Sequence, residues 1–188
     1  MDLQGYSRPN RDEAYGLCTD PDLIALMQQA AALRDEGFAS VVTYSRKVFI
    51  PLTKLCRDVC HYCTFAQPPR PGEPAYLSID EMVAIARRGA EAGCQEALFT
   101  LGDKPEQRYP QARYELEQLG YETTIQYLVA AAEAVRDATG LLPHANPGVV
   151  SRDELLALRA VCPSQGMMLE SVSRRLLEKG NAHYGSPD

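Results

Sequence analysis

The pattern of apolar and polar positions along the chain predicts helices that alternate with strands. Apolar residues recur at helical spacing in four segments: 21–37, 78–94, 123–140 and 151–162. Four shorter runs, rich in β-branched, aromatic or other apolar residues, are typical of strands: 40–53, 96–102, 141–148 and 166–173. Such alternation favours an α/β fold with a parallel sheet, whose active face lies at the carboxyl ends of its strands.

Capping residues support two of these helices. Ser78 stands three residues before Glu81, and Ser151 stands three residues before Glu154, which is the spacing of a capping box. By contrast, the segment 103–122 is polar and rich in turn formers. We expect it to be a long loop with a single helical turn between a strand and a helix.

Length and charge narrow the functional classes. With 188 residues, 45% of them hydrophobic, the chain is long enough to bury one sizeable core. The formal net charge is −6, and the sequence has no cluster of basic residues of the kind that binds nucleic acid or an anionic membrane. We therefore expect neither of them as a partner. The polar N-terminus and the absence of an apolar run of about 18 residues predict a cytoplasmic protein.

Three of the six cysteines stand within eight residues, "CRDVCHYC", from Cys56 to Cys63. Packed thiols, a structural zinc site and an iron–sulfur cluster are the competing interpretations. Zinc normally takes four ligands, and the nearest candidate, His61, is adjacent to Cys60 and is better read as a loop histidine that hydrogen-bonds nearby. Three thiolates suit a cluster in which one iron stays open. The other cysteines stand alone, and each is expected to be a small buried hydrophobic residue: Cys18, Cys94 and Cys162.

The C-x₃-C-x₂-C spacing, with Tyr62 just before the last cysteine, resembles the signature of the radical S-adenosylmethionine enzymes. The resemblance implies that Cys56, Cys60 and Cys63 hold a [4Fe-4S] cluster whose fourth iron binds S-adenosylmethionine. It also implies that the backbone at Tyr62 lies near the adenine of this cofactor.

The same resemblance implies further cofactor contacts. The family has a glycine-rich, often acidic motif at the end of the second strand, and "LGDKPE" takes that place here. Gly102 would let the backbone approach the cofactor, and Asp103 or Glu106 would balance the methionine ammonium. Asn146, at the third strand, and Glu170 and Ser171, at the tip of the fourth, stand where members contact the cofactor ribose or the substrate. From the residues alone, Asn146 is at least as well explained as a turn residue before Pro147, and Glu170 and Ser171 as polar caps of a strand end.

A narrower resemblance extends from about residue 41 to the C-terminus. The segments "TYSRKVFIPLTKLCRDVCHYCTFA", "FTLGDKPEQRY", "HANPG", "GMMLESVSRRL" and "HYGSPD" are similar to the 7,8-didemethyl-8-hydroxy-5-deazariboflavin synthases. The implied reaction is radical cyclisation of an adduct of a tyrosine-derived hydroxybenzyl group and 5-amino-6-ribitylaminouracil, with loss of ammonia. The implied partners are an adduct-forming radical enzyme, as a subunit or a fused half, and a one-electron donor.

The implied architecture is a partial (β/α) barrel. Residues 1–40 are expected to form an N-terminal extension with a helix, and residues 41–188 the first roughly four βα units of the barrel, without its C-terminal part. Two alternatives stay open: another radical S-adenosylmethionine enzyme, such as the adduct-forming partner or a menaquinone-pathway relative, and a non-catalytic zinc-binding module.

Overall fold

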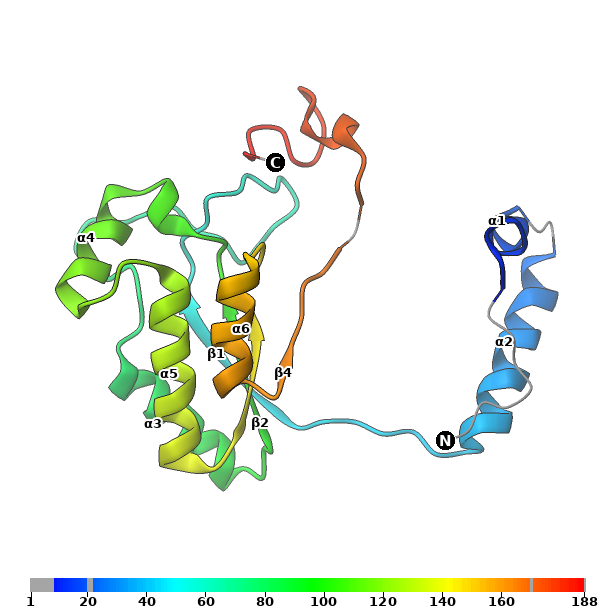
Figure 1. The fold of residues 1–188 in the computed structure, drawn as a ribbon, viewed down its shortest axis with the longest axis horizontal. Helices are drawn as coiled ribbons and strands as arrows, with labels where there is room; N and C mark the ends of the chain where they lie inside the picture. Colours follow the sequence, from blue (N-terminus) through cyan, green and yellow to red (C-terminus); the bar gives the residue numbers. More distant parts are fainter. Residues whose placement is uncertain (1–8, 20–21, 170, 188) are drawn as a thin grey trace. The chain divides into compact units, whose positions relative to one another are not determined.

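The structure is a computed structural model that describes residues 9–19, 22–169 and 171–187 (Figure 1). By its internal contacts the chain divides into two compact units, Met1–Tyr44 and Ser45–Asp188.

The described residues of the first unit form the helices α1 (Arg11–Cys18) and α2 (Leu23–Phe38). Helix α2 confirms the helix expected over 21–37. Helix α1 is not among the expected elements, although its start carries a capping box: the Asn10 side chain accepts from the Glu13 N–H at 2.9 Å, and the Glu13 carboxylate accepts from the Asn10 N–H at 2.7 Å. Neither helix buries any of its described residues.

The second unit is built on a sheet whose described strands are all parallel and lie in the order β1-β2-β3-β4. They are β1 (Lys47–Thr53), β2 (Glu96–Leu101), β3 (Leu142–Asn146) and β4 (Ser164–Gln165). Thr53 is in register with Leu101, and Thr100 with Asn146. The carboxyl ends of the first three strands therefore meet along one edge, as the alternation of elements predicts.

Three of the helices between the described strands pack against the sheet: α3 (Ile79–Glu91), α5 (Thr124–Thr139) and α6 (Arg152–Val161). Each strand pairs with the next one along the chain, so crossovers of one hand place all three helices on the same face of the sheet. Helix α3 packs against α5, and α5 packs against α6 (Figure 1). The capping boxes predicted at Ser78 and Ser151 are both present.

The core lies between these helices and one face of the sheet. Along β2 every second residue is buried, which is the period of a strand with one covered face. The strands and the helices both contribute residues with no exposed surface: Ile50, Leu52, Ala97, Phe99, Ala145, Met82, Ala86, Leu128, Ala132, Val135 and Leu158. One face of the sheet therefore packs against the helices, whereas the carboxyl edge of the sheet is available for a site.

Two expectations are corrected here. The segment 103–122 contains a short 3₁₀ helix, η1 (Pro105–Gln107), and a full helix, α4 (Pro110–Leu119), which the turn-forming residues concealed. The fourth strand is Ser164–Gln165 rather than 166–173. It ends there because Pro147, which follows β3, has no N–H with which to extend the pairing.

None of the helices among the described residues has both the length and the apolar character that crossing a bilayer requires.

Candidate functional site

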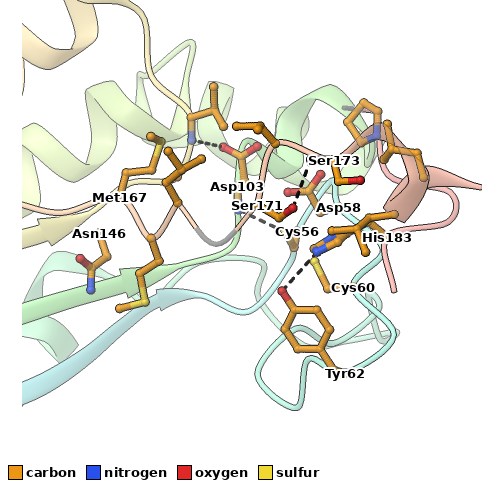
Figure 2. A pocket seen from close by; sticks show the side chains of 18 of the residues that line it. Cys56, Asp58, Cys60, Tyr62, Asp103, Asn146, Met167, Ser171, Ser173 and His183 are labelled. Atoms are coloured by element: carbon orange, nitrogen blue, oxygen red, sulfur yellow. Dashed lines mark hydrogen bonds between the residues drawn. The ribbon is translucent and has the colours of Figure 1, made fainter. Parts of the chain in front are cut away.

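A cavity of about 780 Å³ opens at the carboxyl edge of the sheet (Figure 2). Five residues singled out in the sequence line it: Cys56, Cys60, Tyr62, Asp103 and Asn146. They come from the loop after β1 and from the ends of β2 and β3, which the parallel register brings together.

Gly102 lies where the end of β2 crosses the loop that follows β1. A Cβ atom at this position would lie 1.9 Å from the Leu55 carbonyl oxygen and 2.7 Å from the Cys56 Cβ. The Gly102 N–H donates to the Thr53 carbonyl at 3.1 Å. Glycine is required here because two backbone segments are in contact, so no side chain fits between them.

Asp103 ties three loops together at this point. Its N–H donates to the Cys56 Sγ at 3.2 Å, and its carboxylate accepts from the Arg57 Nε at 2.5 Å and from the Val149 N–H at 3.2 Å. The Arg57 N–H in turn donates to the Asp103 carbonyl at 2.9 Å. Both carboxylate oxygens are thus engaged by protein donors, so the side chain holds the cysteine loop against the loop after β3.

The sulfur atoms of the cysteine loop accept backbone hydrogen bonds. The Cys63 Sγ accepts from the Ala66 N–H at 3.4 Å, as the Cys56 Sγ does from Asp103. Burial raises the pKa of the Cys56 thiol, and backbone hydrogen bonds from Asp58 and Asp103 partly oppose this rise. Donors aimed at sulfur are among the features that tune iron–sulfur clusters in proteins.

The donor set fits such a cluster in its chemistry. Three soft sulfur ligands are available, two of them beside a cavity with room for a further ligand. Within the described parts of the chain, no three His, Cys, Asp or Glu side chains converge on a single point in the manner of metal ligands. The structure therefore brings Cys56 and Cys60 to the cavity, whereas Cys63 is exposed, and the three-cysteine ligand set stays a prediction.

Tyr62 points toward the C-terminal part of the chain. Its hydroxyl lies 3.3 Å from the His183 Nε2, and the two rings meet edge to face with centroids 5.4 Å apart (Figure 2). The His61 Nε2 lies 3.1 Å from the Tyr184 carbonyl oxygen, so His61 is a hydrogen-bonded loop histidine, as expected. His183 was not predicted as a site residue, because its partner Tyr62 is 121 residues away in the sequence.

Asn146 lines the cavity, and its side chain lies next to that of His144. Its Oδ1 lies 3.2 Å from the His144 Nε2, and the His144 Nδ1 lies 2.6 Å from the Ser164 Oγ. His144 and Asn146 alternate along β3 and therefore share the face of the sheet opposite the helices. Neither His144 nor Ser164 was predicted from the sequence. The spacing of two residues between His144 and Asn146 was the available signal that these two side chains share one face of a strand.

Glu170 lies outside the described residues. Its neighbour Ser171 lines the cavity but lies beyond the end of β4, not at a strand tip. Of the isolated cysteines, Cys162 is buried, which raises its pKa to about 11, and Cys94 is half-buried. Cys18 is exposed on α1, which corrects the expectation that it is buried.

Glu106 faces the start of α5. Its carboxylate accepts from the Thr124 hydroxyl at 2.6 Å and from the Thr124 N–H at 3.3 Å. The Tyr76 hydroxyl lies 2.7 Å from the same Thr124 oxygen, which completes a buried polar chain. These contacts give Glu106 a structural position at a helix N-terminus, where a carboxylate is favourable.

We expect Glu106→Ala to lower the free energy of unfolding by about 2 kcal/mol, because it leaves buried donors of Thr124 without an acceptor. Chemical denaturation measures this, with Glu117→Ala, an exposed glutamate on α4, as the matched control. Iron binding by the folded variant should be unchanged. A variant of normal stability that loses iron would instead place Glu106 at the cofactor.

Known proteins resemble this chain in sequence and in fold. The FO synthase of Mycobacterium tuberculosis (strain H37Rv) is 53% identical over 182 residues, which cover 89% of this chain and 21% of that protein. The FO synthase of Nocardia farcinica is 51% identical over 191 residues, covering 95% and 22%. The 7,8-didemethyl-8-hydroxy-5-deazariboflavin synthase of Methanopyrus kandleri is 45% identical over 147 residues, covering 78% and 44%. The chain thus spans about a fifth of the length of the FO synthases it matches.

Solved structures share the fold. Methylornithine synthase superposes with a TM-score of 0.60 at 19% identity, covering 92% of this chain and 47% of that one. The FeFe-hydrogenase maturase HydG from Carboxydothermus hydrogenoformans gives a TM-score of 0.55 at 22% identity, covering 82% and 33%. No protein-family profile matches the chain. The expected partial barrel of the radical S-adenosylmethionine type is confirmed. The chain is therefore a homologue of FO synthase over the segment that the two share, with the fold of the radical S-adenosylmethionine enzymes.

Proposed function

We propose that this chain carries the cluster-binding part of an FO-forming enzyme. The observation that carries the proposal is the homology to FO synthase across a segment that includes the three-cysteine loop beside the cavity. The proposed reaction closes the deazaflavin ring of FO from the adduct of hydroxybenzyl and ribitylaminouracil groups, with loss of ammonia.

In this proposal Cys56, Cys60 and Cys63 hold a [4Fe-4S] cluster. When bound there, the cluster would supply the one electron for reductive cleavage of S-adenosylmethionine, and with it the radical chemistry that the ring closure needs. Because a cluster with one open iron needs space beside it, the cavity that Cys56 and Cys60 line supports this assignment.

The chain's own residues would shape the binding space. Gly102 lets the end of β2 approach the cysteine loop, and Asp103 fixes that loop through Arg57. Asn146 places a polar group at the third strand, where it would bind the cofactor or the substrate. The exposed apolar side chains of Met167 and Met168 also line the cavity, which suits the aromatic part of the adduct.

The proposed partners are an adduct-forming radical enzyme, as a subunit or a fused half, and a one-electron donor. The proposed location is the cytoplasm, where a reducing environment keeps cysteines such as these as free thiols.

Anaerobic reconstitution with iron and sulfide tests the proposal. We expect about four irons per chain. The electron paramagnetic resonance spectrum of the reduced protein should change when S-adenosylmethionine is added. Stoichiometric zinc in place of iron, with no such spectral change, would instead support a zinc-binding module.

A second assay separates FO formation from other radical chemistry. A full-length relative that carries this segment should convert the synthetic adduct into a fluorescent deazaflavin. Cleavage of S-adenosylmethionine without that product would point to the adduct-forming reaction or to a menaquinone-pathway reaction.

A further inference from the structure

A C-terminal segment, residues 181–186, lies along the cysteine loop (Figure 1, red beside cyan). The His61 N–H donates to the Ala182 carbonyl at 2.9 Å, and the Val59 N–H donates to the Ser186 Oγ at 2.8 Å. Val59 and His61 are the two neighbours of Cys60. The backbone on both sides of this cysteine is therefore bound to the same segment.

Side chains add to this contact. The His183 ring meets the Tyr62 ring edge to face, with the Tyr62 hydroxyl 3.3 Å from the His183 Nε2. Gly185 has φ of +97°, and a Cβ atom there would lie 3.6 Å from the side chain of Val59. The close approach thus continues along the whole segment.

The segment is itself anchored before it reaches the loop. The Asn181 Nδ2 donates to the Arg175 carbonyl at 2.8 Å, and the His183 N–H donates to the Leu176 carbonyl at 2.9 Å. Both acceptors belong to the short 3₁₀ helix η2 (Arg174–Leu177). A segment that is already folded on η2 loses little conformational entropy when it binds the loop.

The cysteine loop depends on such outside support. Residues 54–63 form no helix or strand, so the loop makes few regular backbone hydrogen bonds of its own. The end of β2 supports the loop at Cys56, through Gly102 and Asp103. Residues 181–186 support it at Cys60, four residues later.

We propose that residues 181–186 position Cys60 for its metal, with His183 and Ser186 as the positioning side chains. This role rests on the proposed function, because it concerns the cluster that the loop would hold. The segment keeps the backbone on both sides of Cys60 in place, so that the loop retains one arrangement both before and after metal binds.

The test compares the 188-residue chain with the double variant His183→Ala/Ser186→Ala. The matched control is Glu178→Ala/Lys179→Ala, two exposed residues just before the segment. Amide hydrogen exchange on the metal-free protein reports directly on the Val59 and His61 N–H groups. Protection there should fall about tenfold in the double variant and stay unchanged in the control, while protection of α5 stays the same in all three.

A second readout uses the reconstituted protein. Iron should leave the double variant about tenfold faster than the parent chain when a chelator is added, with the control unchanged. Equal protection, or equal iron loss by the parent chain and the double variant, overturns the positioning role. If the parent chain binds no iron, the proposed function fails, and hydrogen exchange still decides whether the segment holds the loop.

Discussion

Replacing Gly102 with alanine is expected to lower the free energy of unfolding of the sheet-containing unit by at least about 3 kcal/mol. A Cβ atom there would lie 1.9 Å from the Leu55 carbonyl oxygen and 2.6 Å from its carbonyl carbon. Both atoms belong to the backbone, so the clash cannot be relieved by a side-chain rotation. Either the end of β2 or the start of the cysteine loop has to move, which also disturbs the hydrogen bond from Asp103 to Cys56.

Urea denaturation followed by circular dichroism measures this loss. A change of this size is a large part of the roughly 5–15 kcal/mol that stabilises a typical domain. Gly37→Ala is the control, because Gly37 lies in α2 and no heavy atom beyond its chain neighbours and the backbone of its own helix lies within 4 Å of the position of its Cβ. The control should be neutral or slightly stabilising. A loss below about 1 kcal/mol in Gly102→Ala would show that the two segments separate easily.

The elements that were predicted correctly carry their signals locally. The start of α3 requires only Ser78, Glu81 and the apolar positions that follow, and the start of α6 repeats this pattern at Ser151. Strand β2 alternates buried and half-buried residues over its length. Periodicity and capping are properties of short segments, so they can be read without knowledge of the fold.

The elements that were missed or misplaced depend on distant partners. Helix α4 begins at Pro110, and Leu116 on it is fully buried in the core. Its mean polarity concealed an apolar face that only the packed structure reveals. Strand β4 stops at Gln165 because Pro147, the residue after β3, has no N–H to donate, although Met167 and Leu169 look like strand residues in the sequence.

The candidate site shows the same division. The cysteine spacing was evident from the sequence because it is local. Gly102 was expected to let the backbone approach a cofactor, and in the structure it lies against the backbone of Leu55. Asp103 and Glu106 both looked like ligands for a cofactor ammonium, yet each carboxylate accepts hydrogen bonds from protein groups. Such bonds join loops that are far apart in the sequence, so the type of residue alone does not reveal them.

Cys60→Ala is expected to abolish cluster binding, with iron falling from about four per chain to below about one after anaerobic reconstitution. The proposed cluster has three protein ligands, and the loss of one leaves two irons without a protein donor. Cys60 is also the proposed ligand whose two neighbours donate hydrogen bonds to the C-terminal segment. Iron and sulfide analysis, together with the absorbance of the reconstituted protein, measures the change.

Cys18→Ala is the matched control, since Cys18 is an exposed thiol on a different unit of the chain. It should bind as much iron as the parent chain does. The Cys60 variant should also unfold at the same urea concentration as the metal-free parent, because Cys60 is only partly buried and its replacement opens no core cavity. Loss of iron with unchanged stability would then identify Cys60 as a ligand, whereas full iron content in Cys60→Ala would overturn the three-cysteine assignment.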